Sequence, residues 1–133
     1  MTDKPLPRPT PKTQPFWDAL REHRIDIQQC DACHRWVFFP RPHCPHCFSQ
    51  SLAWKTVSGE GELLTYTLSR LPTLPQFADE LPQKLAVVRL DEGVHMNTTL
   101  VGLAEDQIEV GMRVKPVFDD VTQDMTLLRF TRA

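Results

Sequence analysis

The four cysteines of this chain form two pairs with the spacing of metal-binding turns. Cys30 and Cys33 make the first pair, Cys44 and Cys47 the second, and ten residues separate them in a chain of 133 residues that has no other cysteine. Two Cys-x-x-Cys turns at this separation can bring four thiolates to one tetrahedral point. The spacing therefore predicts a structural Zn²⁺ in a closed site, with no coordination position left for a substrate.

Disulfide and redox chemistry are the first alternatives for these cysteines. The chain begins without the apolar stretch of a secretory signal, which predicts a cytoplasmic, reducing location and argues against disulfides. A redox Cys-x-x-Cys normally stands alone at the start of a helix, whereas these two copies flank residues 36–39, Trp-Val-Phe-Phe, which are typical of a strand. Both alternatives are therefore disfavoured.

Haem attachment and histidine ligation are further alternatives. Residues 30–34 match the Cys-x-x-Cys-His pattern of covalent haem attachment. Such attachment requires an exported chain, and the second pair would have no role, because Phe48 stands where its histidine is needed. His34, His43 or His46 could replace one thiolate as a ligand, although the four cysteines already complete a tetrahedral set.

The predicted ribbon, residues 27–55, is too short to bury a core of its own. Metal binding would supply much of its folding free energy, since zinc contributes on the order of 10–16 kcal/mol in small finger peptides.

The preceding segment, residues 1–26, combines two features. Alternating prolines in residues 1–15 predict an extended polyproline-II arm, which either wraps onto a partner or frays. Residues 16–24 predict a short helix with Thr13 as its N-cap and Phe16 and Leu20 on one face.

A series of short strands is predicted in residues 56–133. Strand-forming residues occupy 62–68, 84–90, 95–101, 113–118 and 125–130. Asp91-Glu92-Gly93 predicts a hairpin turn between the second and third of these strands. Five strands with no long helical period between them predict a small Greek-key barrel of the OB type, and no apolar run approaches the length of a membrane span. The expected fold is mainly β: an N-terminal helix, a rubredoxin-like zinc ribbon and a five-stranded OB-fold barrel.

The charge of the chain argues against nucleic acid as its partner. Residues 1–55 hold eight Lys or Arg against five Asp or Glu, whereas residues 56–133 hold seven against twelve. A barrel that follows a phosphate backbone needs a basic groove and exposed aromatic side chains for base stacking. The acidic barrel therefore disfavours the main alternative function, a single-stranded nucleic-acid-binding module.

The segment from 70 to 83 is too long and too apolar for a simple connection. It contains Pro72, Pro75 and Pro82 together with apolar side chains that include Leu71 and Phe77. Loops of this length in small domains are usually functional or mobile. Its apolar residues could line a groove for an acyl chain, contact a partner, or cover the open end of the barrel itself.

The order of these features resembles a known family. The shared features are Phe16-Trp17 and Leu20 in a helix, the first Cys-x-x-Cys, Phe38-Phe39-Pro40-Arg41 leading to the second, Ser58-Gly59-x-Gly61, Ala86-Val87-Val88-x-Leu90-Asp91-Glu92-Gly93, and Gly111-Met112-x-Val114. From about residue 16 to 130, the chain resembles the acyl-CoA-associated zinc-ribbon/OB-fold proteins once catalogued as a domain of unknown function. That family usually has glycine after the first Cys-x-x-Cys turn, where this chain has His34.

The resemblance implies a non-catalytic subunit that binds acyl-CoA or serves as a scaffold. Its expected partners are a thiolase-fold enzyme or a hot-dog-fold hydratase and a coenzyme A thioester, in a homo- or hetero-oligomer of acyl-CoA, lipid or steroid metabolism. The sequence itself contains no recognisable catalytic series, so no catalytic residue is predicted. Candidate contacts to the thioester are Arg35 and Arg41 for phosphates, and Phe39, Leu71 and Phe77 for the pantetheine or acyl chain.

Overall fold

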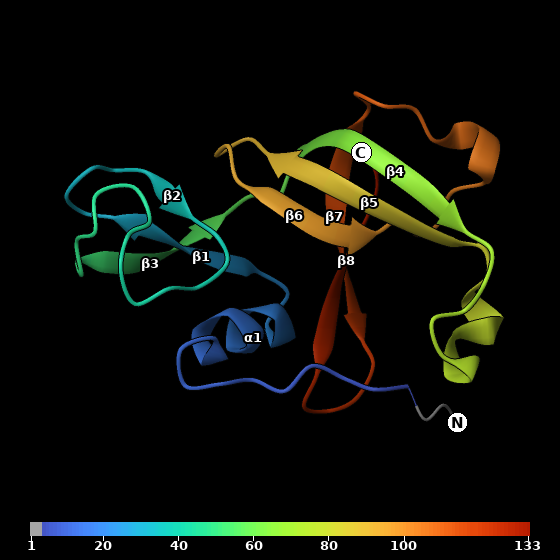
Figure 1. Cartoon of the computed structure of the whole chain (residues 1–133), viewed down its shortest axis with the longest axis horizontal. Coiled ribbons are helices and arrows are strands. Elements are labelled where there is room, and N and C mark those ends of the chain that lie inside the picture. The colour runs from blue at the N-terminus through green and yellow to red at the C-terminus, as the bar shows by residue number, and fades with distance from the viewer. Residues whose placement is uncertain (1–3) are drawn as a thin grey trace.

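The structure, a computed structural model that describes residues 4–133, places a ribbon sheet, a barrel and a helix around one junction (Figure 1). Its elements in chain order are α1 (Gln14–Arg21), β1 (Ile25–Cys30), β2 (Trp36–Val37), β3 (Leu52–Val57), β4 (Gly61–Ser69), η1 (Pro75–Glu80), β5 (Gln83–Leu90), β6 (His95–Thr99), η2 (Glu105–Gln107), β7 (Arg113–Asp120) and β8 (Thr126–Arg132). The predicted mainly β fold with one N-terminal helix is confirmed.

The ribbon is an antiparallel sheet in the order β2-β1-β3. β1 pairs with β3 along its whole length, from Ile25 opposite Val57 to Cys30 opposite Leu52. The strand predicted over residues 36–39 is shorter than expected, because only Trp36 and Val37 pair with β1. The chain then leaves the sheet, and the ring of Phe38 packs against Phe16 of α1 with its centroid 5.5 Å away.

The barrel is a five-stranded sheet in the order β6-β5-β4-β7-β8. A parallel bridge between Leu100, just after β6, and Phe130 of β8 closes the sheet on itself, which is the strand arrangement of an OB fold. β4 pairs with both β5 and β7, and its register shifts between Leu63 and Thr65, where a bulge bends the strand. The five strands predicted from the sequence are therefore present, with their ends moved by one or two residues.

Helix α1 ends earlier than its sequence predicts. His23 has φ 59°, and the backbone N–H groups of His23 and Arg24 donate to the carbonyl oxygens of Leu20 and Ala19 at 2.9 and 3.0 Å. This Schellman arrangement satisfies the last carbonyls and stops the helix at Arg21. Thr13 occupies the predicted N-cap position, but its hydroxyl caps no helical N–H and lies 3.1 Å from the hydroxyl of Thr10 instead.

One hydrophobic core joins the helix, the ribbon and the barrel. Phe16 and Leu20 of α1 lie in the same buried cluster as Ile25 and Ile27 of β1 and as Phe130 of β8. Four of these five side chains come from outside the barrel sequence, so the barrel core is completed by the N-terminal half of the chain. The parts predicted separately from the sequence thus fold as one packed unit.

The arm and the 70–83 loop contact each other. Lys4 lies 3.1 Å from the carboxylate of Asp79 and above the ring of Phe77, with its ammonium 5.9 Å from the ring centroid. The pKa of Lys4 is raised by its hydrogen bond to Glu80 and further by Asp79. The described part of the arm is not frayed but lies along its own barrel, and its contact with a partner stays a prediction. None of the described helices is both long and apolar enough to span a membrane.

We expect Gly61→Ala to destabilise the barrel. A Cβ at Gly61 would overlap the carbonyl oxygen of Arg89 on the paired strand β5, which cannot move without breaking the sheet. Overpacking of this kind typically costs about 1–3 kcal/mol, measured here as the free energy of unfolding in urea. The control is Thr65→Ala, an exposed position on the same strand, which should stay within about 0.5 kcal/mol of the parent. Equal stability of the two variants would contradict the close approach of β4 and β5.

Candidate functional site

The four cysteine sulfurs meet at one point at the outer end of the ribbon. All four Sγ atoms lie within 4.8 Å of one another, and the pairs Cys30–Cys47 and Cys33–Cys44 are each 3.6 Å apart. A tetrahedral ion with sulfur ligands at about 2.3 Å requires sulfurs about 3.8 Å apart. The donor set and its spacing therefore fit a four-coordinate metal ion, bound by Cys30, Cys33, Cys44 and Cys47 as the sequence predicts.

The two Cys-x-x-Cys turns have the same geometry. The residue after each pair, His34 or Phe48, has φ of 64° or 65°, and its N–H donates to the carbonyl oxygen of the first cysteine at 2.9 or 2.8 Å. Within the turns, the N–H groups of Cys33 and His46 lie 3.5 and 3.4 Å from the sulfurs of Cys30 and Cys44. These turns direct backbone N–H dipoles at the sulfurs and reduce the cost of gathering negative charge there.

Hydrogen bonding favours the thiolate form of Cys30, the form that a metal ion requires. The backbone N–H of Cys33 lowers the pKa of the Cys30 thiol to about 6. Four thiolates fill a tetrahedral ion completely, so no position is left to bind or activate a substrate. Metal at this centre would therefore stabilise the ribbon and take no part in a reaction.

A buried glutamine fixes the second turn to the sheet. Gln28 of β1 is buried, and its side-chain amide donates to the carbonyl oxygen of Arg41 at 3.0 Å and accepts from the N–H of Arg41 at 2.8 Å. This double hydrogen bond replaces a strand pairing and holds the chain just before Cys44. This role of Gln28 was not predicted, because a glutamine in a strand is usually exposed.

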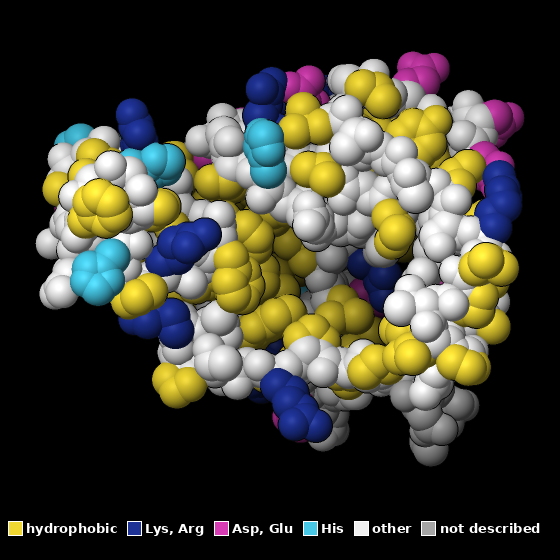
Figure 2. Space-filling model, in the orientation of Figure 1, with side chains coloured by type: hydrophobic (Ala, Val, Ile, Leu, Met, Phe, Trp, Pro, Cys, Tyr) yellow, Lys and Arg dark blue, Asp and Glu magenta, His cyan; other side chains and the backbone are white. Residues whose placement is uncertain are grey.

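A groove opens where the helix, the ribbon and the barrel meet. It has a volume of about 600 Å³ and is visible in Figure 2 as a hollow lined by hydrophobic side chains between the two lobes. One wall is aromatic and consists of Phe16 and Trp17 of α1 with Phe38 and Phe39 of the loop after β2. We call this cavity the apolar groove.

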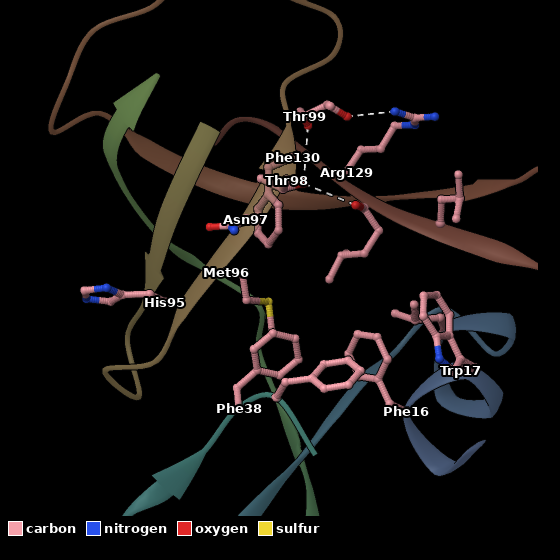
Figure 3. Close-up of a pocket in the computed structure, with 14 residues that line it drawn as sticks. Phe16, Trp17, Phe38, His95, Met96, Asn97, Thr98, Thr99, Arg129 and Phe130 are labelled. Atoms are coloured by element: carbon pink, nitrogen blue, oxygen red, sulfur yellow. Dashed lines mark hydrogen bonds between the residues drawn. The ribbon is translucent and has the colours of Figure 1, made fainter. Parts of the chain in front are cut away.

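The opposite wall of the apolar groove belongs to the barrel and is partly polar. It is formed by β6 and by residues 127–130 of β8, with Met96 facing the aromatic wall in Figure 3. The hydroxyl of Thr98 donates to the carbonyl oxygen of Leu128 at 3.2 Å, and the guanidinium of Arg129 donates to the hydroxyl of Thr99 at 2.7 Å. The groove is thus suited to a molecule with an apolar body and some hydrogen-bonding groups.

The residues predicted to contact a thioester are not all brought together. Phe39 lines the apolar groove, with 46% of its surface exposed, and Phe77 lines a second cavity beside it. Leu71 lines neither cavity and is 81% exposed. Arg35 and Arg41 are exposed on the ribbon and line neither cavity.

Several residues of the apolar groove were not predicted from the sequence. They come from three separate elements, and none is of an unusual type for a helix or strand: Trp17, Met96, Thr99 and Arg129. The one available signal was the aromatic face of the helix, where Trp17 lies beside Phe16 and Leu20. A composite groove of this kind is defined by the packing of the elements, which no local pattern specifies.

Fold and metal centre together define a zinc-ribbon/OB-fold protein. The family model of the ChsH2 rubredoxin-like zinc ribbon domain matches residues 17–53, and that of the ChsH2 C-terminal OB-fold domain matches residues 54–119. A DUF35 domain-containing scaffold protein of Methanothermobacter thermautotrophicus is 36% identical over 78% of this chain and 78% of its own length. The chain belongs to this DUF35 family, as the resemblance in its sequence indicated.

Two further similarities give the family its context. A solved structure described as the Ltp2-ChsH2(DUF35) aldolase contains a chain that is 33% identical and superposes with a TM-score of 0.85, covering 96% of this chain and 98% of that one. A probable enoyl-CoA hydratase alpha subunit of Thermomonospora curvata is 38% identical over 95% of this chain. The chain spans only 40% of the length of that hydratase subunit.

We predict that the ribbon loses its metal and its fold together. Apart from the cysteines, its own buried cluster contains little more than Val37 and Leu52, so Cys44→Ser should abolish stoichiometric metal and speed hydrogen exchange across residues 30–52, while β4–β8 stay protected. The readouts are elemental analysis and hydrogen exchange followed by mass spectrometry. His46→Ala, which removes a neighbouring side chain but no thiolate, is the control and should keep the metal. Slow exchange across residues 30–52 in metal-free Cys44→Ser would refute the prediction.

Proposed function

We propose that this chain is a non-catalytic accessory subunit that binds an enzyme acting on coenzyme A thioesters. The observation that carries the proposal is the apolar groove, an open site built from helix, ribbon and barrel beside a metal centre that is closed to substrate. Relatives point the same way, since they include scaffold proteins, a hydratase alpha subunit and the ChsH2(DUF35) component of an aldolase. We place the partner among thiolase-fold enzymes or hot-dog-fold hydratases.

We propose Zn²⁺ as the ion of the metal centre. Four thiolates in a tetrahedral arrangement suit Zn²⁺, which has no geometric preference of its own and no redox chemistry. The family model that matches residues 17–53 is that of a zinc ribbon. In this role the ion fixes the ribbon and, through it, the aromatic wall of the apolar groove.

We further propose that the apolar groove holds the acyl or pantetheine portion of the thioester. Its aromatic wall offers apolar surface to methylene groups, while the Thr98, Thr99 and Arg129 side chains of the barrel wall offer polar groups to amides or carbonyls. A volume of about 600 Å³ lies within the usual range of small-molecule sites. The net negative charge of the barrel disfavours the phosphates of coenzyme A there, so these would lie toward the partner or the more basic ribbon.

The first test is co-expression with a thiolase-fold enzyme or a hot-dog-fold hydratase from the same genome. We expect a stable heteromeric complex in size-exclusion chromatography with light scattering, because a groove that is open at the surface is completed by a second protein. The control is each protein expressed and run alone. Two separate peaks at micromolar concentrations of both proteins would count against the accessory role.

The second test concerns the groove alone. Phe39→Ala removes a ring from the aromatic wall and should weaken the binding of a medium-chain acyl-CoA thioester about 5–30-fold, since burial of an aromatic side chain contributes about 1–2 kcal/mol. Binding is measured by calorimetry, or by the fluorescence of Trp17, which lines the same groove.

The matched control for this test is Leu71→Ala. Leu71 was an equal candidate on sequence grounds, but it lies outside the groove and is far more exposed than Phe39. Its substitution should leave the affinity unchanged. If both variants lose affinity equally, or neither does, the thioester binds elsewhere.

A further inference from the structure

A second cavity lies next to the apolar groove along strand β8. It has a volume of about 620 Å³ and lies between the N-terminal arm, η1 and the turn that joins β7 to β8. Leu127 and Arg129 line both cavities. The two spaces are therefore neighbours that share one wall.

The side chain of Arg129 is the partition between them. Its Nε donates to the carboxylate of Asp119, which lines the second cavity, at 2.8 Å. One of its terminal nitrogens donates to the hydroxyl of Thr99, which lines the apolar groove, at 2.7 Å (Figure 3). Only 18% of the side chain is exposed, so the guanidinium is held across the boundary by one bond on each side.

The far side of the second cavity is covered by the arm. Lys4, Pro5 and Leu6 line it, and the ion pair of Lys4 with Asp79 fastens the arm to η1. The cavity beyond Arg129 is thus walled by the rest of the chain and already contains apolar side chains such as Phe77 and Val121. An acyl chain that extended past Arg129 would enter this second cavity and could contact its apolar side chains.

We propose that Arg129 is a specificity-determining residue that limits the length of the acyl chain accepted by the apolar groove. The inference rests on the proposed function, in which this groove holds the acyl portion of a thioester. Each methylene buried in the groove raises the affinity about fourfold. This gain in affinity stops where the acyl chain meets the Arg129 guanidinium, which is bonded to Asp119 and Thr99. Displacing the guanidinium would leave the Asp119 carboxylate without its partner.

The experiment measures the affinity of straight-chain acyl-CoA thioesters, from butanoyl to stearoyl, for the metal-loaded full chain. For the parent, we expect the affinity to rise about fourfold per methylene and then to reach a plateau. Arg129→Ala removes the partition and should move the plateau to longer chains. The readout is the chain length at which the plateau begins, which does not depend on how far the absolute affinity falls with the loss of the guanidinium. Arg132→Ala, which removes the same charge from the same strand outside both cavities, is the control and should keep the parental plateau.

Thr99→Val is a second variant that keeps the test decisive if Arg129→Ala fails to fold. It removes one of the two anchors of the guanidinium and should move the plateau in the same direction by a smaller step. An unchanged plateau in both folded variants, or in Thr99→Val when it alone folds, overturns the inference while leaving the proposed function intact. A parental affinity that does not depend on chain length overturns the groove as the acyl site, and the inference with it.

Discussion

The four-sulfur centre is the constraint on which the rest of the structure depends. The ribbon contributes only a small buried cluster of its own, in which Cys30 and Cys44 are two of the three fully buried members. A segment with so little apolar surface needs a cross-link to hold one conformation, and four thiolates on one metal ion would provide it. Through β1, the same cross-link continues into the main core, because Ile25 and Ile27 lie on the strand that ends at Cys30.

The apolar groove depends on that constraint in turn. Phe38 and Phe39 follow the short strand β2, so their position is set by the ribbon and by the packing of Phe38 on Phe16. The barrel supplies the opposite wall and the helix supplies the floor between them. A site made from three parts of the chain exists only when all three are folded, which couples the metal centre to the groove although no metal ligand lines it.

The fold could be predicted from the sequence to the extent that its signals are local. Cysteine spacing predicted which four sulfurs lie together, and alternating strand-forming residues with glycine turns identified all five barrel strands. Thr13 stands at the N-cap position as predicted, but its hydroxyl caps no N–H, because a threonine there has more than one partner within reach and here contacts Thr10. Phe39, predicted as a thioester contact because of its apolar side chain, lines the groove, whereas Arg129 was not predicted because a charged residue in a strand usually points outward. Its role depends on Asp119 and Thr99, which reach it only through the barrel topology.

Closure of the barrel and the polar wall of the groove are two aspects of one feature. β6 and β8 are not ladder partners, and only the bridge from Leu100 to Phe130 joins their ends by backbone pairing. Away from that bridge the gap is spanned by side chains, with Thr98 bonded to the Leu128 carbonyl and Arg129 to Thr99. An OB barrel that closed fully by backbone pairing at this point would have no opening for the aromatic wall to face. The incomplete closure therefore creates the groove, and the side-chain groups that span the gap form its polar wall.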